Sequence, residues 1–167
     1  MRLLIAGLLG LVSLMLAVPA VVRHAPVAGS ASAALPAVTA GYGDGWNSIA
    51  VPSDASGQFM VAGMVNGAAV TFLVDSGASE IVLSPEDARR AGYRAGQARF
   101  TRTASTANGS VRLAAVTLRE LRIGQLSRRG VDAVVNEAPM PVSLLGMSFL
   151  RELEGWEAKD GRLMLYW

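Results

Sequence analysis

The stretch FLVDSGASEIVLS, residues 72–84, sets one aspartate, Asp75, between two apolar segments. A carboxylate at the end of a buried strand costs free energy unless hydrogen-bond donors surround it. Gly77 permits a tight turn whose backbone N–H groups point toward the carboxylate, and Ser76 adds a hydroxyl that can reach a neighbouring backbone group. Two interpretations of this stretch stay open: an ordinary Asx turn at a strand end, or an aspartate held rigidly at the mouth of a cleft.

The segments around this stretch alternate between short apolar runs and turns, a pattern typical of an all-β barrel or sandwich. Asn66-Gly67 favours a type I′ hairpin turn, and the strand that follows it leads to Asp75. Further strands are expected at residues 81–83, 99–105 and 111–118, in two short stretches within 121–135, and in a hairpin that turns at Asp160-Gly161.

Two short helices are expected among the strands. Residues 84–92, SPEDARRAG, carry a serine N-cap, a proline at the first helical position, acidic residues in the first turn and a glycine terminator. A second helix, of two turns, is expected at Met147–Leu153 directly after Gly146. A strand that passes behind the Asp75 turn at close range would need that glycine.

The hairpin between the strands expected at 99–105 and 111–118 is more polar than the first one. Its turn, Thr106-Ala107-Asn108-Gly109, has a polar tip and contains glycine. A tip of this composition is suited to a mobile lid over a binding cleft.

Together these motifs resemble the retropepsin-like (clan AA) aspartic proteases. The resemblance rests on DSGAS at residues 75–79 after an apolar strand, and on Leu144-Leu145-Gly146 before a short helix. It covers about residues 57–167 and is closest to the bacterial single-domain members with an N-terminal membrane segment, which share the STANG and LLGMSFL stretches. The resemblance implies an all-β, closed acid-protease barrel with one or two short helices, preceded by a transmembrane helix.

The resemblance also implies a role for each motif. Asp75 corresponds to the catalytic aspartate, and its support is formed by Ser76, Gly77, Ala78, Leu145 and Gly146. The flap that covers a substrate corresponds to Thr106, Ala107, Asn108 and Gly109. Ser76 stands where threonine is common in the family, and it keeps the hydroxyl.

The chain contains a single Asp-Ser-Gly motif, whereas aspartic protease chemistry needs two carboxylates about 3 Å apart that share one proton. Neither Asp132 nor Asp160 is followed by a turn of small residues. We therefore expect a C2 homodimer in which each copy supplies one Asp75 and one flap, with an acid-shifted optimum for hydrolysis of a peptide or protein substrate.

Candidates for the dimer interface are residues 46–51 and the terminal stretch LMLYW, residues 163–167. Trp156, Tyr166 and Trp167 could instead complete the core of one chain. The alternative function is a non-proteolytic peptide-binding or dimerisation module of the cell envelope with the same fold. A ligand-binding β-barrel that resembles the family by accident is a third possibility.

Composition narrows the chemistry further. The chain has no cysteine and a single histidine, His24, so cysteine nucleophiles, thiolate metal sites and most histidine-dependent mechanisms are excluded. Neither a cofactor nor a metal site is expected. Beyond Arg23 the chain carries 13 basic and 13 acidic residues, so no nucleic-acid partner is expected. Residues 89–129 hold ten arginines and one acid, Glu120, and this positive face suits either plain solvation or an anionic partner.

The N-terminal region differs from the rest of the chain. Residues 3–22 carry no charge and are long enough to span a bilayer core of about 30 Å, so residues 1–24 are predicted to be a transmembrane anchor or signal segment. Small residues at 18–20 and 31–33 resemble cleavage sites, although an uncut anchor is favoured. Residues 25–45 are predicted to be a flexible tether, and residues 46–167 the protease domain. The expected location is the bacterial inner membrane, single-pass, with the domain in the periplasm.

Overall fold

The computed structural model describes residues 39–43, 46–94, 98–106 and 109–167. These residues all belong to one compact unit, residues 34–167. The predicted membrane segment, most of the predicted tether and two predicted flap residues, Ala107 and Asn108, lie outside them. Among the residues that are described, no helix has the length and apolarity needed to cross a membrane.

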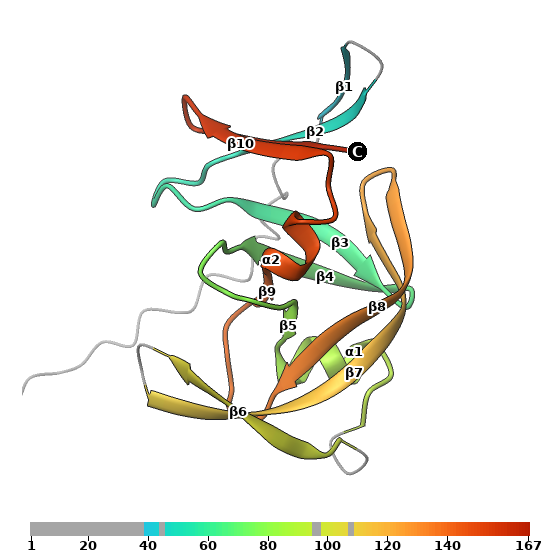
Figure 1. The fold of residues 1–167 in the computed structure, drawn as a ribbon, viewed down its shortest axis with the longest axis vertical. Helices are drawn as coiled ribbons and strands as arrows, with labels where there is room; N and C mark the ends of the chain where they lie inside the picture. The colour runs from blue at the N-terminus through green and yellow to red at the C-terminus, as the bar shows by residue number, and fades with distance from the viewer. Residues whose placement is uncertain (1–38, 44–45, 95–97, 107–108) are drawn as a thin grey trace, which may run out of the picture. The chain divides into compact units, whose positions relative to one another are not determined.

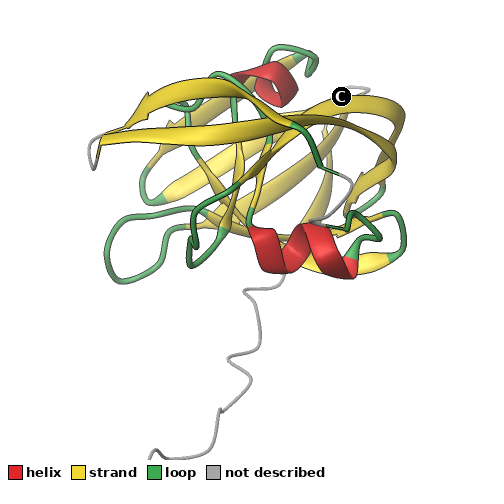
Figure 2. Ribbon diagram, turned by 90° about the horizontal axis from the view of Figure 1, so that it is seen from below, coloured by secondary structure: helices red, strands yellow, loops and turns green. Residues whose placement is uncertain are grey.

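Strands make up most of the described chain, and both helices are short (Figure 1). The first strands are β1 (Thr39–Gly43), β2 (Trp46–Pro52), β3 (Met60–Val65), β4 (Ala68–Val74) and β5 (Val82–Leu83). After helix α1 (Pro85–Arg90) come β6 (Phe100–Thr106), β7 (Gly109–Ile123), β8 (Leu126–Asn136) and β9 (Ser143–Leu145). Helix α2 (Met147–Leu150) precedes the last hairpin, β10 (Gly155–Lys159) and β11 (Arg162–Tyr166). The two helices lie on opposite sides of the strands (Figure 2).

Six strands form a closed barrel in the order β3-β4-β9-β5-β8-β7, and β3 pairs with β7 to complete the ring. Gly63 of β3 lies at this closure, opposite Ile123. A Cβ on Gly63 would come within 2.9 Å of the carbonyl oxygen of Arg122, so the closure needs glycine. The predicted closed all-β barrel with two short helices is therefore confirmed.

A second sheet, in the order β1-β2-β11-β10, joins the two ends of the described chain. Ile49 and Val51 of β2 face Leu165 and Leu163 of β11, and all four side chains are buried. The two segments predicted as a dimer interface thus pair with each other within one chain, and they complete its core. β1 lies in the stretch predicted to be a tether. The sequence did not reveal this strand, because its backbone pairing with β2 needs no apolar pattern.

Local turn chemistry is confirmed at two places. Asn66 and Gly67 have φ values of 52° and 91°, as a type I′ turn requires, and they join β3 to β4. The N-cap predicted for α1 is also present, since the Ser84 hydroxyl accepts a hydrogen bond of 3.1 Å from the N–H of Asp87.

Two predicted element lengths are wrong. The helix expected at Met147–Leu153 ends at Leu150, because the chain then turns so that Leu153 is buried and the Glu154 N–H donates to the carbonyl oxygen of Tyr166 at 3.0 Å. The strand expected at 111–118 continues to Ile123 as one strand of 15 residues. Its buried positions change parity between Leu118 and Leu121, where the pairing with β8 skips Arg119 and Gly130 has a φ of 66°.

Candidate active site

Asp75 stands immediately after β4, and its backbone and side chain are both fixed. Its N–H donates to the carbonyl oxygen of Leu145 at 3.1 Å, and its Oδ1 accepts the N–H of Gly77 at 2.8 Å. The N–H of Ala78 donates to the carbonyl oxygen of Asp75 at 3.2 Å. Ser76 is exposed, and no hydrogen bond joins its hydroxyl to another described residue. The turn is thus an Asx turn that is also held by a second strand.

That second strand is β9, which runs parallel to β4 with Val74 opposite Leu145. Gly146 follows it and passes so close to the Asp75 loop that a Cβ would lie 2.2 Å from the carbonyl oxygen of Glu80 and 2.7 Å from that of Ala78. The predicted need for glycine behind the turn is confirmed.

The start of α2 adds support that the sequence did not reveal. The N–H groups of Met147 and Ser148 donate to the carbonyl oxygens of Ala78 at 2.8 Å and Ser79 at 3.0 Å. The Ser148 hydroxyl accepts the N–H of Ile81 at 3.1 Å. The whole loop between Asp75 and β5 is therefore bonded to the segment from β9 into α2.

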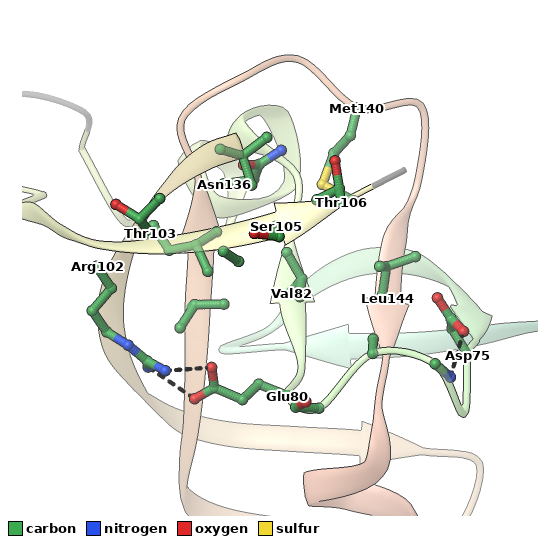
Figure 3. Close-up of a pocket in the computed structure, with 17 residues that line it drawn as sticks. Asp75, Glu80, Val82, Arg102, Thr103, Ser105, Thr106, Asn136, Met140 and Leu144 are labelled. Atoms are coloured by element: carbon green, nitrogen blue, oxygen red, sulfur yellow. Dashed lines mark hydrogen bonds and ion pairs between the residues drawn. The ribbon is translucent and has the colours of Figure 1, made fainter. Parts of the chain in front are cut away.

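Asp75 faces a cleft of about 700 Å³. Apolar side chains such as Val82 and Leu144 form its floor, and residues of β6, including Ser105 and Thr106, line the opposite side (Figure 3). Thr106 lies opposite Gly109 in the β6–β7 hairpin, and its hydroxyl donates to the Gly109 carbonyl at 2.7 Å. The hairpin predicted to be a flap therefore borders the same cleft as the aspartate, with its tip outside the described residues.

An ion pair lines the cleft on the side away from Asp75 (Figure 3). Arg102 of β6 donates to both carboxylate oxygens of Glu80, at 2.9 and 2.7 Å. The hydrogen bond from Arg102 to Glu80 and the attraction of the carboxylate raise the pKa of the Arg102 guanidinium. Sequence reasoning missed this pair because its members lie in different segments with no motif to link them.

The arginine-rich stretch is less positive than its composition predicted. Four of its ten arginines form ion pairs with acids that all lie outside residues 89–129. The arginines are Arg89, Arg90, Arg102 and Arg112, and the acids are Glu80, Glu86, Asp87 and Glu137. Within the described residues no group of three or more histidine, aspartate or glutamate side chains is arranged to hold a metal ion.

A closed six-stranded barrel with an Asp-Ser-Gly turn, a strand and glycine behind it, and a hairpin bordering its cleft defines the retropepsin-like class of aspartic proteases. The chain belongs to that family, since residues 61–152 match the family described as "gag-polyprotein putative aspartyl protease".

Solved structures agree with this assignment. A retropepsin-like aspartic protease from Rickettsia conorii is 34% identical, with a TM-score of 0.65, over 71% of this chain and 98% of that one. The EIAV protease complexed with the inhibitor HBY-793 is 19% identical, with a TM-score of 0.54, over 65% of this chain and 100% of that one, and shows the shared fold.

Two uncharacterized bacterial proteins are also similar. One from Sinorhizobium sp is 37% identical over 123 residues, and one from Rickettsia prowazekii (strain Madrid E) is 33% identical over 117 residues. The matches cover 73% and 70% of this chain but 53% and 50% of the relatives. The chain therefore spans about half the length of these curated relatives.

Proposed function

We propose that the protein is an aspartic endopeptidase whose active site is formed by two Asp75 carboxylates, one from each copy of a homodimer. The observation that carries this proposal is the fixed Asp75 turn at the edge of the cleft, with its N–H bonded to Leu145 and its Oδ1 bonded to Gly77. Its support comes from two separate parts of the chain, so the carboxylate is held in one direction, as a catalytic group must be.

The chemistry is proton transfer around a water molecule. The ionised carboxylate of the pair removes a proton from water while the protonated one donates a hydrogen bond to the carbonyl oxygen of the substrate. The water oxygen then attacks the carbonyl carbon and forms a tetrahedral intermediate. Transfer of a proton to the amide nitrogen lets the C–N bond break, which gives a new carboxyl end and a new amine end.

The proposal includes a second copy because, among the described residues, one chain brings to the cleft a single carboxylate that is not in an ion pair. Asp75 and Glu80 are the acidic residues that line the described cleft, and Glu80 is engaged by Arg102. Asp132 lies in β8, where it accepts a hydrogen bond of 3.1 Å from Thr117, and Asp160 lies in the β10–β11 turn.

The open edge of β10 is the candidate dimer interface. β10 ends the four-stranded sheet, and its Trp156 is 39% exposed, the large apolar side chain most accessible among the described residues. Two β10 strands paired antiparallel around Ala158 would set Glu157 of each copy opposite Lys159 of the other. Opposite charges at facing positions favour such pairing.

The test uses the purified 167-residue chain in detergent with a peptide library between about pH 4 and pH 7, because two coupled carboxylates titrate as a pair and the optimum has to be found by a scan. We expect cleavage that an active-site-directed aspartic protease inhibitor blocks. Asp75→Ala should reduce turnover about a thousandfold or more, as loss of a catalytic group does. Asp132→Ala, the same substitution at an aspartate outside the cleft, should retain turnover.

Cleavage by Asp75→Ala at the wild-type rate, or by a strictly monomeric protein, would refute the proposal. Peptide binding without any cleavage would favour the alternative of an envelope peptide-binding module. We further propose that the uncharged stretch at residues 3–22 directs the protein to the inner membrane, with the protease domain exported; fractionation of cells and protease access to spheroplasts test this location.

A further inference from the structure

Helix α1 carries a buried carboxylate that the proposed hydrolysis does not use. Asp87 is 6% exposed, and its Oδ2 accepts a hydrogen bond of 2.6 Å from the hydroxyl of Ser143. Its Oδ1 forms an ion pair with Arg90. A buried carboxylate is costly unless such donors surround it, so these contacts specify how α1 sits against the strand that carries Ser143.

The contacts form a closed ring. The Ser143 hydroxyl that donates to Asp87 also accepts the N–H of Ser84 at 3.0 Å, and the Ser84 hydroxyl accepts the N–H of Asp87 at 3.1 Å. Ser84 is 3% exposed and Ser143 is fully buried. We call Ser84, Asp87, Arg90 and Ser143 the Asp87 network.

The network reaches both strands that hold Asp75. Ser143 is the first residue of β9, whose Leu145 accepts the Asp75 N–H. Arg90, paired with Asp87, donates to the carbonyl oxygen of Ala69 in β4 at 3.2 Å, and β4 ends directly before Asp75.

The pairing of these two strands is short, with β9 contributing three residues, Ser143 to Leu145. A slip of one residue would turn the buried side chains of β9 to the opposite face, and a pairing of three residues has few backbone hydrogen bonds to resist it. The directional hydrogen bond from Ser143 to Asp87 fixes where β9 begins along β4.

We propose that Asp87 is a positioning residue for the active site, which fixes β9 against β4 through Ser143 and Arg90 and thereby holds the Asp75 turn in place. The expected effect on catalysis rests on the proposed function. The effect of Asp87 on the backbone of Asp75 can be measured without any substrate.

The test compares Ser143→Ala with Ser127→Ala in the full-length protein. Ser127 is a matched control, since its hydroxyl also donates to a carboxylate, that of Glu120, at 3.0 Å on the surface. We expect hydrogen exchange of the Asp75 amide to be about tenfold faster in Ser143→Ala, while that of Val134 in β8 keeps the wild-type rate. We also expect kcat to fall about tenfold with KM within about twofold, because positioning acts on the reacting groups.

If Ser143→Ala does not fold, a second variant, Asp87→Asn, replaces it, since the amide oxygen still accepts a hydrogen bond from Ser143. We expect the exchange of the Asp75 amide to rise and kcat to fall, both by less than in Ser143→Ala. Wild-type exchange at Asp75 with a uniform loss of stability would overturn the inference and leave the network a purely structural one. If the wild type cleaves no peptide but the Asp75 amide exchanges faster in Ser143→Ala, the proposed function is wrong and Asp87 still positions the Asp75 turn.

Discussion

Arg102 in β6, a strand of the hairpin predicted to be a flap, donates to both carboxylate oxygens of Glu80, at 2.9 and 2.7 Å. Glu80 belongs to the loop that begins at Asp75, so one ion pair joins the base of the flap hairpin to the loop of the candidate catalytic residue. The two side chains are 48% and 33% exposed, and solvent screens much of their attraction. The bidentate geometry therefore contributes more to the orientation of the two side chains than to the free energy of unfolding.

Removing this pair should loosen the flap hairpin and leave the fold intact. In Arg102→Met we expect a thermal midpoint close to that of the wild type and faster hydrogen exchange at residues 103–106. The KM for peptides should rise roughly threefold, because the substrate must then order the hairpin when it binds. Arg112→Met removes an ion pair of the same hairpin, to Glu137, that does not involve the Asp75 loop, and serves as control. Equal effects of both variants on KM would contradict a special role for Glu80.

Gly146→Ala should be severely destabilising. The added methyl would lie 2.2 Å from the carbonyl oxygen of Glu80, which belongs to the backbone and has little room to move. We expect a loss of about 3 kcal/mol in the free energy of unfolding, as for other overpacked sites. Chemical denaturation measures it, with Gly155→Ala as control, because a Cβ there would meet Tyr166 at an ordinary 3.8 Å.

Leu165→Ala tests whether β11 belongs to the fold of a single chain. Leu165 is fully buried opposite Ile49, so truncation should cost about 2–5 kcal/mol. Met164 is only partly buried, and Met164→Ala should cost clearly less. If both variants unfold at the wild-type denaturant midpoint, the pairing of β2 with β11 is not a feature of the isolated chain.

Charge reversal tests the proposed pairing of two β10 strands. Lys159→Glu would set Glu157 opposite a like charge in both symmetric contacts and should weaken the dimer roughly tenfold. The double swap Glu157→Lys with Lys159→Glu should restore the affinity, because the opposite charges then face each other again. Sedimentation measures the dissociation constants, and failure of the double variant to recover would place the interface elsewhere.

Asp54 predicts a pH dependence of stability in the turn between β2 and β3. The Ser56 hydroxyl donates to its carboxylate at 2.7 Å, and the N–H groups of Gln58 and Ser56 donate at 2.9 and 2.8 Å. These bonds lower the pKa of Asp54 below its ordinary value of 3.8. Because the folded pKa is the lower one, the stabilisation is fully present above the unfolded value and is lost as pH falls through the folded value.

Asp54→Asn should therefore melt below the wild type at neutral pH, and the gap in melting temperature should narrow as pH falls below about 4. Ser56→Ala removes the largest cause of the pKa shift and should reproduce part of that narrowing. A gap that stays constant from neutral to strongly acidic pH would show that the carboxylate charge is not responsible.

Sequence patterns predicted the features that depend on neighbouring residues. The Asn66-Gly67 turn, the Ser84 cap and the Asx turn at Asp75 each need only a few adjacent residues, and all three are present. The glycine at 146 was also predictable, because its position after an apolar strand signals a close backbone approach.

Features that join distant segments were not predictable in the same way. Neither Glu80 and Arg102 nor Asp87 and Ser143 share a motif, and each pair meets only because the barrel closes. For the same reason, sequence reasoning left open whether residues 46–51 and 163–167 meet a second copy or complete the core of one chain. An apolar strand shows that it needs a partner, and not which chain supplies it; in the structure the two segments pair with each other.

The distance in sequence between Asp75 and the strand behind it has a consequence for biosynthesis. During translation Asp75 leaves the ribosome well before Leu145 and Gly146, and until they emerge its N–H lacks the carbonyl that holds it. The nascent barrel therefore carries an unassembled site while most of its strands are already made. On the proposed function, the site is therefore complete only after Leu145 and Gly146 have been synthesised and two copies have met.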